Sequence, residues 1–233
     1  MGENVQISTV DGFYTAYIAH PPSGHGPGLL VLPEIYNSNE HIRGVAENFS
    51  AEGFITLAPD VFWRIQPDCY LPYTESGQAR ARELNQGLDV DHTHNRPPKR
   101  RTVTSDNVDG NSGLIGSVGF CLGGKLSYLC ATRLGVDAAV SYYGVKIENY
   151  LEEASNIVCP MVLHFAGNDP RVPLSARDKI QQKFQDRENV EIYLYPDAEH
   201  GFNRLGYPPY HEKSASVALR RTLHLFQNHL FKQ

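Results

Sequence analysis

Long apolar runs are absent from this chain of 233 residues, and so are several sequence signals of localisation or cofactor binding. No stretch approaches the roughly 18 apolar residues that a membrane-spanning helix needs, so we expect no membrane partner. The first residues have neither the basic start nor the apolar core of a secretory signal. Without a glycine-rich loop of the Walker or Rossmann type, a nucleotide cofactor is not expected either.

Cysteine is scarce, with four residues and no CxxC pair or zinc-type spacing. This usage indicates reduced thiols in the cytoplasm and predicts no metal site.

Positively charged residues are fewer than negatively charged ones: there are 21 Lys and Arg and 26 Asp and Glu, which gives a net charge of −5. The balance argues against nucleic acid as a partner. A chain of this length buries enough surface to fold without a cofactor.

Short continuous apolar runs alternate with helical patterns along the chain. An alternating edge strand is predicted at 13–19 after a polar start, and buried strands at 29–32, 55–58, 114–120, 138–142, 161–165 and 190–195. Helices are predicted at 39–52, 75–88, 123–134, 175–185 and 210–231. Continuous apolar strands suit a parallel sheet covered by helices. We therefore predict one α/β domain over residues 1–233, with a mostly parallel central sheet flanked by helices.

Residues 89–113 break this pattern. The stretch has almost no apolar residues and contains His92, His94, two prolines and the basic run 99–101. A solvated surface is the more common role of an isolated basic run in an acidic chain. We interpret the segment as an exposed polar excursion that binds neither metal nor nucleic acid.

A candidate nucleophile lies between a predicted strand and a predicted helix, in Gly119-Phe120-Cys121-Leu122-Gly123-Gly124. A strand that turns sharply into a helix exposes the central residue and needs small neighbours, the arrangement known as a nucleophile elbow. The helix N-terminus favours a thiolate at Cys121, and the backbone N–H of Leu122 can face a developing oxyanion. The alternative is a buried structural cysteine at a tight turn.

Two later strands end in residues that complete a catalytic set. Asp169 follows the strand at 161–165, and His200 follows the strand at 190–195. The order nucleophile, acid, base and the strand-end positions match α/β-hydrolase enzymes. Taken singly, Asp169 could be a turn-forming residue and His200 a loop histidine. Their coincidence with Cys121 favours a triad.

At this point the sequence resembles the dienelactone hydrolase (carboxymethylenebutenolidase) family, a group of single-domain α/β-hydrolases with a cysteine nucleophile. The matching segments are 32–36 with Pro33-Glu34-Ile35, 58–62, 119–124, 142–145, 167–169, and 199–202 with Arg204. The resemblance implies that Glu34 holds the thiol neutral at rest and takes its proton when substrate binds. It also implies that the N–H of Ile35 joins that of Leu122 in the oxyanion hole.

The resemblance further implies carboxylate recognition by arginine, whose planar fork bonds a carboxylate at two points. Arg204 stands at the expected position, and Arg80 and Arg82 are two candidates for a second arginine. The bulky aromatic residues expected shortly after these arginines are missing from Leu84-Asn85-Gln86, which bears on the exact substrate. Trp63, Tyr142 and Tyr143 are candidates either to line the pocket or to belong to the core.

These observations predict a cofactor-free hydrolase for a small-molecule substrate, acting as a monomer or small homo-oligomer. It would open a carboxylated enol-lactone, dienelactone, to maleylacetate through a Cys121 thioester in the breakdown of aromatic compounds. A related cysteine esterase or lactonase for other small esters is the alternative. A redox-sensing binding protein with an oxidisable Cys121 is a third possibility, from a different class.

Overall fold

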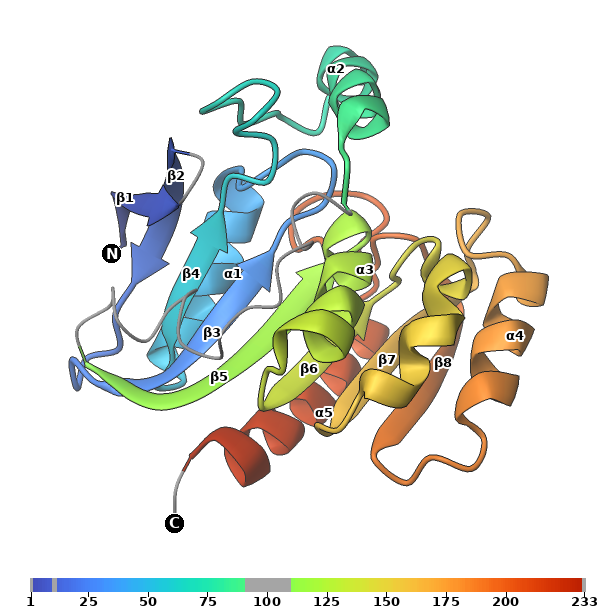
Figure 1. Cartoon of the computed structure of the whole chain (residues 1–233). Coiled ribbons are helices and arrows are strands. Elements are labelled where there is room, and N and C mark those ends of the chain that lie inside the picture. The colour runs from blue at the N-terminus through green and yellow to red at the C-terminus, as the bar shows by residue number, and fades with distance from the viewer. Residues whose placement is uncertain (1, 10–11, 91–109, 232–233) are drawn as a thin grey trace. The chain divides into compact units, whose positions relative to one another are not determined.

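The strands and helices are arranged in two units in a computed structural model that describes residues 2–9, 12–90 and 110–231 (Figure 1). The first unit comprises residues 1–115 and the second residues 116–233. Strand β5 (Asn111–Phe120) begins in the first unit and continues into the second. The single domain over residues 1–233 stays a prediction, and residues 91–109 of the polar excursion lie outside the described residues.

Among its described residues, the first unit contains strands in the order β1-β2-β4-β3 and two helices. Its elements are β1 (Glu3–Thr9), β2 (Gly12–Ala19), β3 (Gly26–Leu32), α1 (Glu40–Ala51), β4 (Ile55–Pro59) and α2 (Glu75–Gly87). β3 and β4 run parallel, whereas β2 is antiparallel to both β1 and β4. Every residue of β3 is buried, as its continuous apolar run predicts.

The prediction that residues 13–19 form an edge strand was wrong. The polar start that precedes them forms β1, which pairs along the whole of β2, so β2 lies between β1 and β4. In β1 only Ile7 is buried, and most of its other side chains are exposed. A mostly polar strand suits the edge of a sheet, because charged and polar side chains discourage pairing with another chain.

In the second unit β5 and the three following strands run parallel in the order β5-β6-β7-β8. Its other elements are α3 (Leu122–Leu129), η1 (Cys130–Leu134), β6 (Ala138–Tyr142), η2 (Ile147–Asn156), β7 (Met161–Asn168), α4 (Leu174–Phe184), β8 (Val190–Glu199) and α5 (Glu212–Leu230). The predicted strands and helices of this unit are thus present. The 3-10 helix η2 was not predicted.

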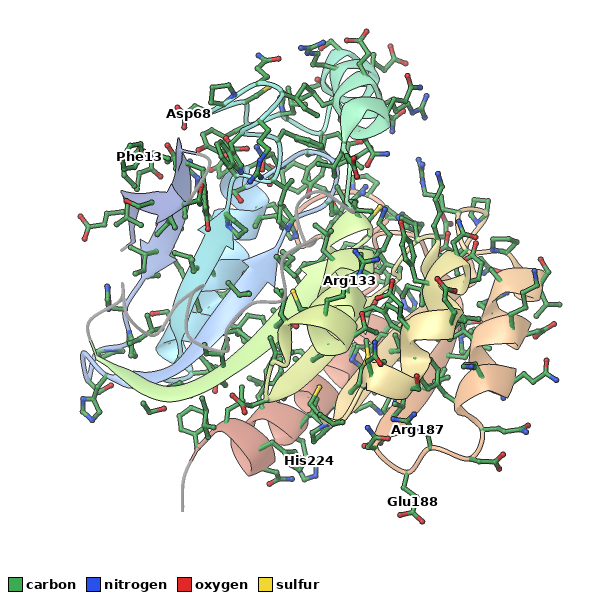
Figure 2. The ribbon with its side chains drawn as sticks, in the orientation of Figure 1. Phe13, Asp68, Arg133, Arg187, Glu188 and His224 are labelled. Carbon is green, nitrogen blue, oxygen red and sulfur yellow. The ribbon has the colours of Figure 1, made fainter. Side chains whose placement is uncertain are left out.

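Helices α3 and α5 cover opposite faces of β6, and α5 also packs against β7 (Figure 1). Neighbouring residues of β6 show the alternation: Ser141 lies against Gly124 of α3, whereas the hydroxyl of Tyr142 is 2.7 Å from that of Thr222 on α5. Between η1 and η2, Arg133 forms an ion pair with Glu153 at 2.5 Å. Figure 2 labels Arg133 of η1, and also Arg187 and Glu188 in the turn between α4 and β8. None of the helices within the described residues is long and apolar enough to cross a membrane.

Candidate active site

Cys121 occupies the turn between β5 and α3 in a strained backbone conformation. Its φ of 55° and ψ of −111° are rare for a residue with a side chain, and such strain is typical of nucleophile elbows. The glycines explain how the turn closes. A Cβ on Gly119 would lie 1.8 Å from the carbonyl oxygen of Gly123, so only glycine fits there.

Main-chain hydrogen bonds hold both sides of Cys121. Its N–H donates to the carbonyl of Tyr142 at 3.0 Å, and its carbonyl accepts from the N–H of Val145 at 3.3 Å. Leu122 is the first residue of α3, where the N–H groups have no partner inside the helix. Its N–H is therefore suited to binding an oxyanion.

His200 and Asp169 lie together at the ends of β8 and β7. Nδ1 of His200 is 2.8 Å from Oδ2 of Asp169, and both side chains are buried. The other oxygen of Asp169 accepts from the N–H of Arg171 at 2.8 Å, which fixes the carboxylate. Asp169 thus orients the imidazole and also forms the turn that its position after β7 favours.

Cys121 affects the pKa of His200 through its charge. Nε2 has no partner that meets hydrogen-bond geometry within the described residues. Burial alone would lower the pKa of His200, but the negative charge of the Cys121 thiolate, together with the hydrogen bond and charge of Asp169, raises that pKa to about 9. The second unit therefore brings Cys121, Asp169 and His200 together, and a thiolate–imidazolium pair fits their electrostatics.

The two candidate tyrosines after Cys121 lie in different surroundings. Tyr143 is completely buried, and its ring centroid is 4.9 Å from that of His200. Tyr142 points instead to the α5 side, where Thr222 bonds to both its hydroxyl and the buried His164. Burial lowers the pKa of His164 to about 3, so this histidine is a neutral core residue.

Arg204 lies beside the turn that carries His200. A Cβ on Gly201, whose φ is +92°, would be 2.9 Å from the guanidinium carbon of Arg204. The guanidinium therefore lies against the backbone next to His200. This position is compatible with a role in binding an anionic group of a substrate.

Glu34 lies in the first unit, in a turn directly after β3. Its carbonyl accepts from the N–H of Asn37 at 3.0 Å, and the half-buried Ile35 lies within this turn. The side chain is 1% exposed, and the hydroxyl of Tyr73 donates to Oε2 at 2.8 Å. The burial and this hydrogen bond hold the carboxylate in one orientation.

The turn of Glu34 rests on a second buried carboxylate, that of Asp60 at the end of β4. Oδ1 of Asp60 accepts from Nδ2 of Asn37 at 2.6 Å and from the N–H of Phe62 at 2.9 Å. Its Oδ2 accepts from the N–H of Asp68 at 2.7 Å. Burial raises the pKa of Asp60, although these hydrogen bonds oppose the change.

The arginine candidates on α2 have different partners. Arg80 is exposed and forms an ion pair with Glu83 at 2.6 Å and a hydrogen bond with Gln66. Arg82 donates to Gln78 at 3.0 Å, and Gln78 donates to the hydroxyl of Tyr36 at 3.2 Å. Of the two, only Arg82 is thus connected to the segment that carries Glu34.

Trp63 stacks on Tyr14 of β2 with ring centroids 5.8 Å apart, and the guanidinium of Arg64 lies over its ring. It is therefore placed against the β2 side of the first unit.

Two residues that support the turn of Glu34 were missed by sequence reasoning. Tyr73 had no motif to mark it, whereas Asp60 stood within a segment of the family resemblance but without a role. Within the described ranges, no group of three His, Cys, Asp or Glu side chains is arranged to hold a metal.

Comparisons with known proteins bear on the family and the fold. The model of the "Dienelactone hydrolase family" matches residues 14–230. A carboxymethylenebutenolidase from a Pseudomonas species is 31% identical over 93% of this chain and 90% of its own. One from Pseudomonas putida is 29% identical over 95% and 94%. The crystal structure of a dienelactone hydrolase-like promiscuous phosphotriesterase from metagenomic libraries has a TM-score of 0.80 at 19% identity, covering 99% of both chains. These findings confirm the predicted α/β-hydrolase fold and the prediction of a hydrolase for esters or lactones.

Proposed function

The chain belongs to the dienelactone hydrolase family, and from this premise we propose that it opens dienelactone to maleylacetate through a cysteine thioester in the cytoplasm. The observation that carries the proposal is Cys121 in a nucleophile elbow, in the same unit as a buried His200 whose imidazole is oriented by Asp169. The four cysteines are free thiols, which fits a reducing compartment.

In the first step the Cys121 thiolate attacks the lactone carbonyl. The C–S bond forms first and moves the carbonyl electrons onto oxygen, where the N–H of Leu122 stabilises the oxyanion. Collapse of this intermediate then breaks the C–O bond to the ring oxygen. The leaving group is an enolate, which is stable enough to depart and then takes a proton, His200 being one source. By the family resemblance, the N–H of Ile35 is the second donor to the oxyanion, and Glu34 is the group that takes the thiol proton.

The second step, hydrolysis of the thioester, needs His200 as a neutral base. Formation of the thioester lowers the pKa of His200 and so favours the neutral ring. The thiolate charge is the main influence that raises the pKa of His200 against its burial. Once that charge is consumed in the C–S bond, the pKa of the imidazole falls towards the value that burial favours. A neutral ring, oriented by Asp169, can then take a proton from the water that hydrolyses the thioester.

The carboxylate of dienelactone is the feature that distinguishes it from simple esters. Arg204, which lies against Gly201 beside His200, is the proposed anchor for that carboxylate. Arg80 and Arg82 both remain candidates for a second anchor; both are exposed on α2, where Arg80 pairs with Glu83 and Arg82 bonds to Gln78.

An assay of the purified protein on cis- and trans-dienelactone beside a neutral p-nitrophenyl ester tests the proposal. We expect the lactone to be preferred, and trapping with acid should give a mass increase on the peptide that contains Cys121. The Arg204→Ala variant should lose about tenfold or more in kcat/KM on dienelactone and little on the neutral ester. Equal turnover of both substrates by the unmodified protein would favour the alternative, an esterase without carboxylate selectivity.

A further inference from the structure

The end of strand β7 leads directly into Asp169 and lies beyond the regular pairing of the sheet. The ladder between β6 and β7 ends at the pair Tyr142 and His164. On the other side, the register between β7 and β8 shifts between Ala166 and Asn168. An irregular register disrupts the ladder locally, so the neighbouring strands hold the main chain before Asp169 less firmly than the rest of β7.

Arg177, on helix α4, supplies hydrogen bonds to this stretch. Its Nη1 donates to the carbonyl oxygen of Ala166 at 2.8 Å and to that of Gly167 at 3.2 Å. Gly167 has no room for a side chain, because an added Cβ would lie 2.3 Å from the carbonyl oxygen of Pro196 on β8. The guanidinium and this close approach thus fix the chain two residues before Asp169.

The polar contacts of Arg177 are directed at the main chain. Within the part of the chain that the structure describes, its guanidinium has no carboxylate partner, and its buried Nε has no hydrogen-bond partner. The side chain therefore does not balance a charge. Its contacts support one role, which is to hold the last carbonyls of β7 before Asp169.

The loop 169–173 joins β7 to α4, and Arg177 connects the two ends of this loop. Inside it, Oδ1 of Asp169 accepts from the N–H of Arg171 at 2.8 Å. Oδ2 of the same carboxylate lies 2.8 Å from Nδ1 of His200. A shift of the loop would consequently turn both the carboxylate and the imidazole that it orients.

We propose that Arg177 is a positioning residue for Asp169: by binding the carbonyls that precede the loop, it keeps the carboxylate aligned with Nδ1 of His200. The inference rests on the proposed catalytic set, because Asp169 and His200 must take part in the reaction. It requires neither a particular substrate nor a particular charge on Cys121 in the resting protein.

A double-mutant cycle tests the proposal, with a neutral p-nitrophenyl ester or dienelactone, whichever the enzyme turns over. Arg177→Met keeps a long stem and removes the donors, so we expect kcat to fall about five- to tenfold while KM changes less than about twofold. In the Asp169→Asn background the same change should lower kcat less than about twofold, because the carboxylate that it aligns is already missing. A purely structural role would not make the effect on kcat depend on Asp169.

Arg187→Met is the matched control. Arg187 is also half-buried and donates to the carbonyl oxygens of Ala154, at 3.3 Å, and Ile157, which lie before β7 rather than at its end. Figure 2 shows it in the turn between α4 and β8. Both variants should lower the midpoint of thermal unfolding by a few degrees, but Arg187→Met should leave kcat unchanged.

If Arg177→Met does not fold, Arg177→Gln replaces it, because an amide two bonds shorter cannot reach both carbonyls. An unchanged kcat in the Arg177 variant, or an equal loss with and without the Asp169 carboxylate, would overturn the inference. So would a loss of kcat in Arg187→Met as large as that in Arg177→Met. An Asp169→Asn protein with full activity would instead overturn the proposed catalytic set, and the inference with it.

Discussion

The turn that carries Cys121 and the turn that carries Glu34 both follow a buried strand, but they are held in different ways. Around Cys121 the chain is fixed by backbone contacts: Gly119 against Gly123, and main-chain bonds from Tyr142 and Val145. Around Glu34 it is fixed by side chains, among them Asn37 and Tyr73. The first turn therefore depends on the absence of side-chain atoms, and the second on particular polar groups.

The difference predicts which changes each turn tolerates. A substitution at the Cys121 turn is expected to remove either the reacting atom or the space that the backbone needs. One at the Glu34 turn is expected to weaken a hydrogen bond and to leave the rest of the turn in place. The following changes test this contrast, beginning with the largest effect.

Replacing the nucleophile should have the largest effect on activity. Cys121→Ala removes the attacking sulfur without adding bulk, and the loss of a nucleophile lowers kcat by about 10⁴-fold or more. Steady-state assays on dienelactone and on a neutral ester measure the loss, and circular dichroism checks that the fold is kept. If more than about a tenth of the activity remains, Cys121 is not the nucleophile.

Adding a single methyl group beside the nucleophile should have the largest effect on stability. A Cβ at Gly119 would lie 1.8 Å from a backbone oxygen that has little freedom to move. We expect Gly119→Ala to lower the free energy of unfolding by at least about 3 kcal/mol, measured by denaturant titration. Gly44→Ala is the control: Gly44 lies within helix α1 with no atom within 4 Å of its added Cβ, so this change should stabilise by about 0.5 to 1 kcal/mol. Equal effects of the two changes would contradict the close approach at the Cys121 turn.

These two turns also show what the sequence could predict. The Cys121 turn is encoded within six consecutive residues, and its glycine spacing is a direct consequence of the sharp turn, so the nucleophile could be identified with its strand and helix. The supports of Glu34 come from far along the chain, with Asn37 and Asp60 separated by 23 positions and Glu34 and Tyr73 by 39. No local pattern indicates such pairs. Strand β1 was missed for a related reason, because an exposed edge strand has few apolar residues to mark it.

Asp60 tests the side-chain support of the Glu34 turn. Asp60→Ala leaves the buried donors of Asn37 and Phe62, and the partly buried N–H of Asp68, without this acceptor, which should lower the free energy of unfolding by about 2 to 3 kcal/mol. Asp186→Ala is the control, since that carboxylate is exposed and its one hydrogen bond, to Gln185, is long at 3.4 Å. We expect almost no change there in the same denaturant titration. A fully stable Asp60→Ala protein would mean that this turn does not depend on its polar side chains.

The charge of Cys121 should be visible in the titration of His200. Burial lowers the pKa of His200, and the charge of Cys121 is the largest of the influences that raise it to about 9, ahead of the hydrogen bond and charge of Asp169. Cys121→Ala should therefore lower that pKa by about one unit. A raised pKa means that the ring is charged at pH 8 in the unmodified protein, and the ring should become largely neutral at that pH in the variant. The imidazole resonances of His200 followed by nuclear magnetic resonance between about pH 5 and 10 measure both values. An unchanged pKa would show that Asp169 alone sets the charge of His200.

The smallest expected effect belongs to a single hydroxyl group. Tyr73→Phe removes the donor to Oε2 of Glu34 and keeps the ring that packs against Tyr36 with centroids 4.6 Å apart. We expect the free energy of unfolding to fall by about 1 kcal/mol, because one buried hydrogen bond is lost. If Glu34 acts on the thiol, kcat/KM should also fall by about three- to tenfold, since the carboxylate is no longer held in one orientation. Tyr70→Phe is the matched control: its hydroxyl donates at 3.2 Å to Asp68 on the exposed surface of the same segment, so both quantities should stay unchanged. A loss of stability in Tyr73→Phe without any loss of activity would leave Tyr73 as a support of the fold and would count against a catalytic role for Glu34.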